Sequence, residues 1–342
     1  MLDKKLLVQY TKSPVFTEAL KISQNSNIEL VPLGQGEYNV NYIFSHPGTG
    51  KRLLLRINTG SQLHLDDQIE YEFSALQNLY SSGRTPKAYF CDNSRSLIPH
   101  GVMVMEWLPG RALRYESDMA DAAAILADIH STPVPDDCRL IRPAHPAASI
   151  YEECLRMVEH YLTWDAARPN TCKLLEELVK EIGRLPLATS SQAAPCMVNT
   201  ELNSANFLIN PGSTSYLIDW EKPLLSEPAQ DLGHFLVPTT TLWKTESILS
   251  PGDIVDFTSM YIKAVGGRID IRDLKDRLPL FFTVTCLRGT TWCSMAMKEY
   301  SQPGRAIANA DTFAKIKQFL DDDFLENILN NYVKNNFLSG IN

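Results

Sequence analysis

Three polar side chains in one short segment of this 342-residue sequence have the types and order that metal-dependent group transfer requires. Glu201 precedes Asn206 by five residues, and Asp219 follows a short apolar run and precedes a Trp-Glu pair. Mg²⁺ prefers oxygen ligands from one or two side chains, completed by phosphates and water. We therefore expect Asn206 and Asp219 to hold Mg²⁺, and Glu201 to accept the proton of a hydroxyl that attacks ATP. The alternative is an ordinary loop, because Asn and Asp also favour turns.

A pair of glycines upstream could cover the phosphates of a nucleotide. Gly34 and Gly36 lie between two predicted strands, and Asn39 follows them. A glycine-rich loop lets backbone N–H groups approach phosphate oxygens closely. We expect these three residues to contact the nucleotide, although a G-x-G pair is also typical of an ordinary hairpin turn.

A single cation stands in the next apolar strand. Arg56 lies in the run RLLLRIN, where it could reach the α- and β-phosphates. Such a cation needs a carboxylate to orient it, and the helix that follows offers two. Glu72 is the candidate partner and Glu70 the second choice, since helical spacing alone leaves both open. The alternative is that Arg56 is a solvated residue at the edge of a sheet.

The segment VMVMEWLPG predicts a buried strand that ends at a Pro-Gly joint. An adenine can hydrogen-bond to the backbone edge of such a strand without any particular side chain. We expect the peptide groups near Glu106 and Leu108 to serve this purpose.

The elements that position these residues change type along the chain. Short apolar runs bounded by turn residues, with partial alternation over 39–46, predict strands over 28–33, 39–46, 52–57, 87–91 and 101–107, and amphipathic spacing predicts a helix over 66–80. Later segments predict helices over 118–130, 148–162, 170–184, 228–236, 251–265, 273–299 and 311–336, interrupted by a strand–turn–strand segment over 196–219. A chain of this length exceeds one ordinary core. We predict an α+β fold of two lobes, with an antiparallel-sheet nucleotide-binding lobe over 1–107 and a helical lobe over 108–342 that carries the catalytic loop, metal site and acceptor site.

Composition excludes several classes of protein. The net charge of −8 argues against a nucleic-acid binder. The seven cysteines are scattered without a C-x-x-C pair, which indicates neither a zinc site nor a disulfide framework. No apolar run approaches the ~18 residues that span a bilayer, and the N-terminus lacks a signal-peptide pattern. We therefore expect a cytoplasmic protein without a membrane partner, and the sequence does not indicate its oligomeric state.

Taken together, these motifs resemble the aminoglycoside phosphotransferase and choline kinase-like family, which has a protein-kinase-like fold. The matching pieces are GQGEYN, LLLRIN, EYEFSALQNL, MVMEWLPGRAL, ADIHSTP, ELNSANFLI, YLIDWE and EPAQDLGHFL, in the family's order. The resemblance implies Mg²⁺ ligation by Asn206 and Asp219, an Arg56 in place of the more usual Lys, and a structural role for Asp231 in bracing the catalytic loop. It also implies that His130 is a core or capping residue.

The sequence departs from the family pattern at the catalytic loop. The family loop begins His-Gly-Asp, whereas this one begins Asn199-Thr200-Glu201. Glu is one methylene longer than Asp, and a shift of ~1 Å at a reacting group can cost ~10²-fold in rate. Two hypotheses follow: an ATP-dependent phosphotransferase that acts on a hydroxyl of a sugar, an amino alcohol or an aminoglycoside-like compound, or a pseudokinase that binds nucleotide without turnover.

Overall fold

The computed structural model describes residues 4–35, 38–61, 63–302 and 310–335. The chain divides into two compact units, and each is described here by itself. Unit 1 contains Met1–Ala112, Thr132–Leu140 and Phe207–Pro223, and unit 2 contains Leu113–Ser131, Ile141–Asn206 and Leu224–Asn342. The predicted lobe boundary after residue 107 stays a prediction.

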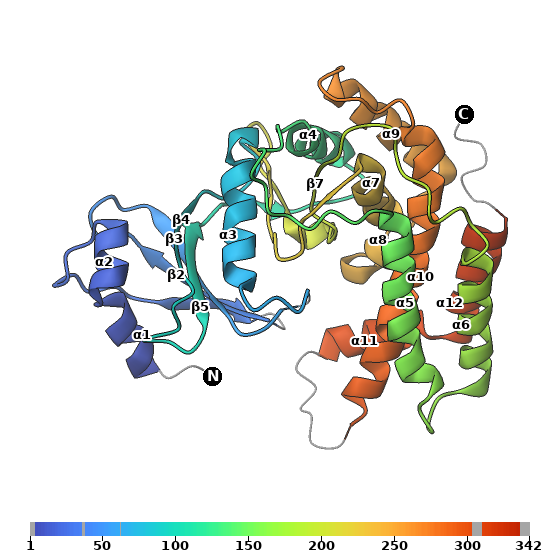
Figure 1. Ribbon diagram of the computed structural model, residues 1–342, viewed down its shortest axis with the longest axis horizontal. Helices are drawn as coiled ribbons and strands as arrows, with labels where there is room; N and C mark the ends of the chain where they lie inside the picture. The colour runs from blue at the N-terminus through green and yellow to red at the C-terminus, as the bar shows by residue number, and fades with distance from the viewer. Residues whose placement is uncertain (1–3, 36–37, 62, 303–309, 336–342) are drawn as a thin grey trace. The chain divides into compact units, whose positions relative to one another are not determined.

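Unit 1 is built on a five-stranded antiparallel sheet (Figure 1). Its strands are β1 (Val31–Gln35), β2 (Asn39–Ser45), β3 (Arg52–Asn58), β4 (Ala88–Asp92) and β5 (Gly101–Glu106). Their order across the sheet is β1-β2-β3-β5-β4, so each strand pairs antiparallel with its neighbours. The sequence predicts all five strands within a few residues of their bounds.

Two helices at the N-terminus, α1 (Lys4–Thr11) and α2 (Pro14–Leu20), cover one face of this sheet (Figure 1). Their apolar side chains join a core with β2, β3 and β5, which includes Tyr10, Phe16, Phe44, Leu55 and Val104. The apolar pattern of the sequence predicts no helix in this region. The Ser13-Pro14 pair is a typical helix start and was the available signal in the sequence. In the structure the Ser13 hydroxyl caps α2 by accepting a hydrogen bond from the Phe16 N–H.

Helix α3 (Gln68–Leu79) packs against β4 and β5. Alternation along β3 decides which residues belong to which face. Leu53, Leu55 and Ile57 lie in the core beneath α1 and α2. Arg56 therefore points to the opposite face, because successive side chains of a strand alternate.

Short elements complete unit 1. These are the 3₁₀ turn η1 (Tyr80–Ser82) and a three-stranded sheet of β6 (Arg111–Ala112), β8 (Phe207–Ile209) and β9 (Tyr216–Leu217), in the order β6-β8-β9. Gly110 precedes β6 with φ of +147°, and a Cβ there would lie 2.9 Å from the backbone of Leu208. Only glycine permits this approach of the two chain segments.

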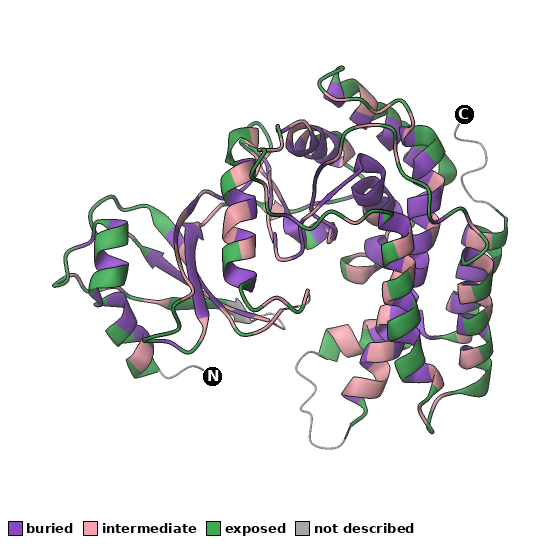
Figure 2. Cartoon of the chain, in the orientation of Figure 1, coloured by how far each residue is buried: buried purple, intermediate pink, exposed green. Residues whose placement is uncertain are grey.

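Unit 2 is mainly helical. Its helices are α4 (Met119–His130), α5 (Pro146–Leu162), α6 (Pro169–Ile182), α7 (Pro228–Leu236), α8 (Pro238–Lys244), α9 (Pro251–Val265), α10 (Leu274–Tyr300), α11 (Ala310–Phe319), α12 (Asp322–Asn327) and the π-helix η3 (Ile328–Lys334). Helix α10 contacts α5, α6, α7, α8 and α11, and Figure 2 shows much of its surface buried. Strand β7 (Cys196–Val198) pairs with β10 (Leu224–Ser226), and the 3₁₀ turn η2 spans Ser204–Asn206.

The predicted helix over 311–336 is divided in the structure. Helix α11 ends at Phe319, and α12 begins after Asp321, whose side chain accepts a hydrogen bond from the N–H of Asp323. This N-cap starts a new helix and explains the break. Within the part of the chain that the structure describes, no helix has the length and apolar character that a bilayer crossing requires, α10 included. The chain is thus α+β, as the sequence predicts, with an antiparallel sheet in unit 1 and a helical unit 2.

Candidate active site

A buried arginine surrounded by carboxylates forms a candidate site within unit 1. The Arg56 guanidinium contacts Glu72 of α3 through Nη1 and Oε1. The same Nη1 lies 3.5 Å from Asp219 Oδ1 and 3.6 Å from Glu221 Oε1. Of the two partners that the sequence left open, Glu72 is therefore the one in contact. Register explains the arrangement, because Arg56 faces Asn41 across β2 and β3 and its Nε donates to Asn41 Oδ1 at 3.2 Å.

The environment of this cluster shifts both ionisable partners. Burial opposes the charge of Arg56, but Glu72, Asp219 and Glu221 outweigh burial and raise the pKa of the guanidinium. Burial also raises the pKa of Glu72, against the opposing effect of Arg56. Within the described residues, the Glu72 Oε2 atom is buried without a hydrogen-bond partner. A strained set of charges of this kind suits a site that binds a ligand.

Glu221 connects the cluster to the start of β2. Asn39 Nδ2 donates to Glu221 Oε1, and Asn58 Nδ2 donates to Asn39 Oδ1 at 3.1 Å. Gln68 Nε2 donates to the Glu221 backbone oxygen at 2.7 Å. Asn39, one of the predicted nucleotide contacts, is thus buried and fixed at the same face of the sheet as Arg56.

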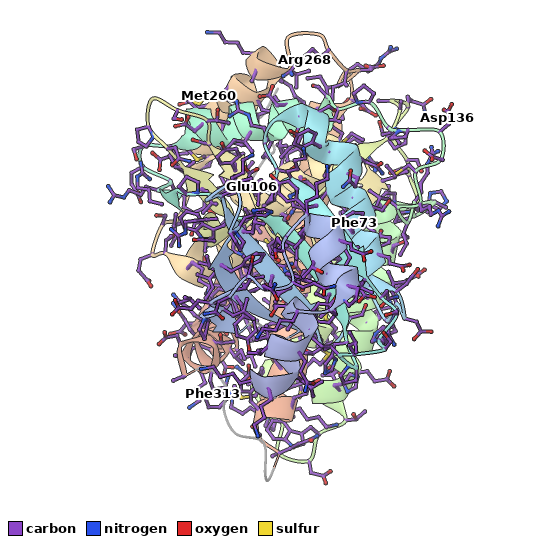
Figure 3. The ribbon with its side chains drawn as sticks, turned by 90° about the vertical axis from the view of Figure 1, so that its left-hand side faces the viewer. Phe73, Glu106, Asp136, Met260, Arg268 and Phe313 are labelled. Atoms are coloured by element: carbon purple, nitrogen blue, oxygen red, sulfur yellow. The ribbon has the colours of Figure 1, made fainter. Side chains whose placement is uncertain are left out.

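The other predicted nucleotide residues lie along this sheet. Gly34 is in β1, opposite Asn41 of β2, whereas Gly36 lies outside the described residues. Glu106, labelled in Figure 3, ends β5, and its N–H donates to the Lys87 oxygen at 2.8 Å. Leu108 lies two residues after the end of β5. Their roles in binding a nucleotide stay predictions.

A second group of predicted site residues lies in the loop after β7, in unit 2, where Asp231 fixes the backbone. Asp231 is fully buried, and its two carboxylate oxygens accept the N–H groups of Asn199 and Thr200, each at 2.8 Å. His130 Nε2 lies 3.1 Å from Asp231 Oδ2, and His130 Nδ1 lies 2.9 Å from the Tyr261 hydroxyl. These contacts agree with the structural roles that the resemblance implies for Asp231 and His130.

Further hydrogen bonds hold the next residues of the loop. The Glu201 N–H donates to Asn199 Oδ1 at 3.0 Å, and the Leu202 N–H donates to His234 Nδ1 at 3.2 Å. Asn206 Nδ2 donates to the Glu201 backbone oxygen at 2.7 Å. This bond orients the amide of Asn206 and leaves its Oδ1 as the acceptor atom that a metal would use. The ligand roles of Asn206 and Asp219 stay predictions.

The Glu201 carboxylate has a cationic neighbour that the sequence motifs do not indicate. Its Oε1 lies 3.8 Å from Arg288 Nη2 of α10, and the Arg288 Nε lies 3.4 Å from Glu153 Oε2 of α5. Burial opposes the charge of Arg288, but Glu153 and Glu201 outweigh it and raise the guanidinium pKa. Glu221 was missed as well. A charged residue within an apolar helical run was the available signal for Arg288, whereas its partners depend on tertiary packing.

Solved structures share this fold at low sequence identity. A candidate aminoglycoside phosphotransferase from Ralstonia eutropha JMP134 has a TM-score of 0.67 and 14% identity, with 98% of this chain and 99% of that chain covered. Plasmodium vivax ethanolamine kinase has a TM-score of 0.63 and 14% identity, covering 94% and 89%. A spectinomycin phosphotransferase in complex with ADP and spectinomycin has a TM-score of 0.62 and 15% identity, covering 96% and 98%. These likenesses show the protein-kinase-like fold.

Comparison of the sequence with known proteins and families identifies a family. No curated protein sequence matches this chain significantly. A family model does match, over residues 29–254, which is well over half of the chain and contains every candidate site residue named above except Arg288 and Tyr261. The chain therefore belongs to the phosphotransferase enzyme family, abbreviated APH.

Proposed function

We propose that this protein transfers the γ-phosphoryl group of ATP to a hydroxyl of a small molecule. The observation that carries this proposal is the buried Arg56–Glu72 pair beside Asp219. Removing two charges from water is costly, and a buried ion pair often adds little net stability. Stability alone therefore does not account for three carboxylates around one guanidinium. Binding of phosphates and a divalent cation would account for them.

The residues of unit 1 would bind the nucleotide. Arg56 would contact the α- and β-phosphates, held in place by Glu72. Gly34, Gly36 and Asn39 would cover the phosphates. The adenine would hydrogen-bond to peptide groups near Glu106 and Leu108, for which the carbonyl of Glu106 is suited because its N–H already donates to Lys87.

The donor set fits Mg²⁺. Asp219 and Asn206 offer a carboxylate and an amide oxygen, the hard ligands that this ion takes in kinases. The carboxylates around Arg56 outnumber the single guanidinium, so the cluster carries excess negative charge that a divalent cation would neutralise. Among the described residues no three His, Cys, Asp or Glu side chains form a metal-binding group. Mg²⁺ bound here would neutralise charge on the transferring phosphoryl group.

The chain's own contribution to the chemistry is positioning and proton transfer. The Glu201 carboxylate would accept the proton of the acceptor hydroxyl as its oxygen forms a bond to the γ-phosphorus. The bond between that phosphorus and the β–γ bridging oxygen breaks, and ADP leaves. Asp231 keeps the loop backbone rigid through the N–H groups of Asn199 and Thr200, so Glu201 starts from a fixed backbone.

Similarity to known structures supports the substrate class. The spectinomycin phosphotransferase structure is a complex with ADP and spectinomycin, and ethanolamine kinase is named for an amino alcohol. We extend from these only that the acceptor is a small hydroxyl compound. Sugars, amino alcohols and aminoglycosides are the classes to test.

A second candidate function is a pseudokinase that binds nucleotide without turnover. The observation that favours it is the Asn199-Thr200-Glu201 loop, which departs from His-Gly-Asp at all three positions. Phosphoryl transfer depends mostly on positioning and metal electrostatics, and a general base typically contributes only ~10²–10⁴-fold. A Glu at this position is therefore compatible with catalysis, and we favour the active enzyme.

Purified protein with Mg-ATP, offered a panel of these acceptors, tests the proposal. We expect ATP consumption that depends on one acceptor, and a phosphorylated product detectable by mass spectrometry. Glu201→Ala should lower kcat by ~10²–10⁴-fold. Glu176→Ala is the matched control, because Glu176 is exposed on α6, and it should leave kcat unchanged. Full activity in Glu201→Ala would show that Glu201 is not the general base. Absence of product with every acceptor would favour the pseudokinase.

A further inference from the structure

A question left by the catalytic loop is what orients a glutamate where the family pattern has an aspartate. The loop backbone is fixed by Asp231, and the Glu201 N–H is held by Asn199. The remaining freedom is that of the Glu201 side chain, which has one more rotatable bond than Asp. Its Oε1 lies 3.8 Å from Arg288 Nη2, and the Glu201 side chain is 24% exposed.

We propose that Arg288 is a positioning residue for Glu201, and that the Glu201–Arg288 pair replaces the shorter aspartate in this chain. This inference rests on the proposed function and deepens it at the same site. Arg288 acts through Glu201, so we assign it no contact with substrate.

The location of Arg288 argues against a chance surface contact. It lies on α10 between buried neighbours, Leu287 and Thr290 among them, and its own side chain is only 17% exposed. A buried charge is costly unless it is paired. Glu153 of α5 supplies a second partner at 3.4 Å, so the guanidinium is held from α5 on one side and faces the catalytic loop on the other.

Length matching explains why the pair belongs together. An aspartate at position 201 would withdraw the carboxylate by about one C–C bond, ~1.5 Å. The contact with Arg288 is already at 3.8 Å, so this retreat would place the two charges beyond ion-pair distance. The glutamate can therefore reach Arg288, and an aspartate on the same backbone could not. Arg288 in turn restricts the longer Glu201 side chain to fewer conformations.

Steady-state kinetics separate positioning from general stability. Arg288→Met keeps an apolar side chain of similar length, and we expect kcat to fall by ~10- to 100-fold with KM for ATP unchanged. Arg288→Lys should recover most of kcat. Arg277→Met is the matched control, because Arg277 is a buried arginine of α10 that pairs with Glu227. It should lower the melting temperature and leave kcat of the folded protein unchanged.

A double-mutant cycle in thermal unfolding needs no acceptor and tests the pair directly. We expect the shifts in melting temperature of Glu201→Gln and Arg288→Met to be non-additive, with the double variant losing less than their sum. Additive shifts, or unchanged kcat in Arg288→Met, would overturn the Arg288 proposal even if the protein transfers phosphate. A coupled cycle in a protein that phosphorylates no acceptor would support the pairing and overturn the proposed function instead.

Discussion

At the scale of single residues, two positions at the candidate site have a backbone conformation that is uncommon for their type. Thr200 has φ of +70° and Asp219 has φ of +66°. Asp tolerates this left-handed region comparatively well, but for a β-branched residue such as Thr it is an outlier. Asp231 maintains the Thr200 conformation through its hydrogen bond to the Thr200 N–H. Strain of this kind gathers at functional sites, where surrounding contacts hold it.

Replacing this threonine should relieve the strain. Thr200→Gly removes about 1–2 kcal/mol of steric cost, partly offset by ~0.5–1 kcal/mol from the greater freedom of glycine in the unfolded chain. We expect the free energy of unfolding to rise by ~0.5–1 kcal/mol, measured with urea. Thr200→Ala is the control, since it removes the side chain beyond Cβ but keeps the strain. Equal effects of the two variants would show that φ at this position is not the cause.

The pairing of Arg56 shows how far sequence reasoning reaches at this scale. The residue types predict a cation with a carboxylate partner and leave that partner open between Glu70 and Glu72. Glu72 shares a stripe with the buried Ile69 and Leu76, at spacings of three and four, whereas Glu70 is exposed. The spacing groups Glu72 with apolar residues, but only the docking of α3 on the sheet shows which stripe faces inward.

At the scale of elements, the strands and long helices were predictable because their apolar periodicity is strong. Helices α1, α2 and α8 were missed, and each is only seven or eight residues long. An isolated helix of that length is unstable, so tertiary packing decides whether it forms. Helix α1 illustrates this, since Tyr10 is buried in the core and its hydroxyl donates to Asp92 Oδ2 of β4 at 2.8 Å.

This anchor predicts a pH-dependent stability. Burial raises the pKa of Asp92, but hydrogen bonds from Ser94 and Tyr10 outweigh burial and lower it. A lowered folded-state pKa gives stability that is present above the unfolded value of ~3.9 and is lost as pH falls through the folded value. Tyr10→Phe should cost about 1 kcal/mol at pH 7, less than the ~1.5–3 of a fully buried bond to a charge, because Asp92 is partly exposed.

The measurement is urea unfolding of both proteins at pH 7 and near pH 3. We expect the difference in free energy of unfolding between wild type and Tyr10→Phe to be smaller at the lower pH, because the hydrogen bond to a protonated Asp92 is weaker. Tyr10 itself does not titrate in this range, since burial and Asp92 raise its pKa. An equal difference in free energy of unfolding at both pH values would exclude a charged Asp92 as the acceptor that stabilises Tyr10.

At the scale of the whole molecule, the family and its fold follow from an ordered set of motifs, none of which suffices alone. The residues that differ from the family pattern, Asn199, Thr200 and Glu201, were evident in the sequence. What supports them was not, because Arg288 lies 87 residues downstream on another element and its partners depend on how α10 packs. Acceptor specificity is not predictable from the sequence for a similar reason, since it depends on side chains that only the folded chain brings together.

Binding of Mg-ATP, followed by thermal unfolding, tests the central claim of a metal–nucleotide site at Arg56 and Asp219. Saturation at ~100 Kd should stabilise the wild type by about 2.7 kcal/mol, and omitting Mg²⁺ should reduce the rise in melting temperature that ATP causes. Asp219→Asn removes one charge at constant size, and we expect it to lose most of this rise in melting temperature. Asp256→Asn, at an exposed position of α9, should keep it. A wild type that is not stabilised by Mg-ATP, or a shift that survives in Asp219→Asn, would contradict the account.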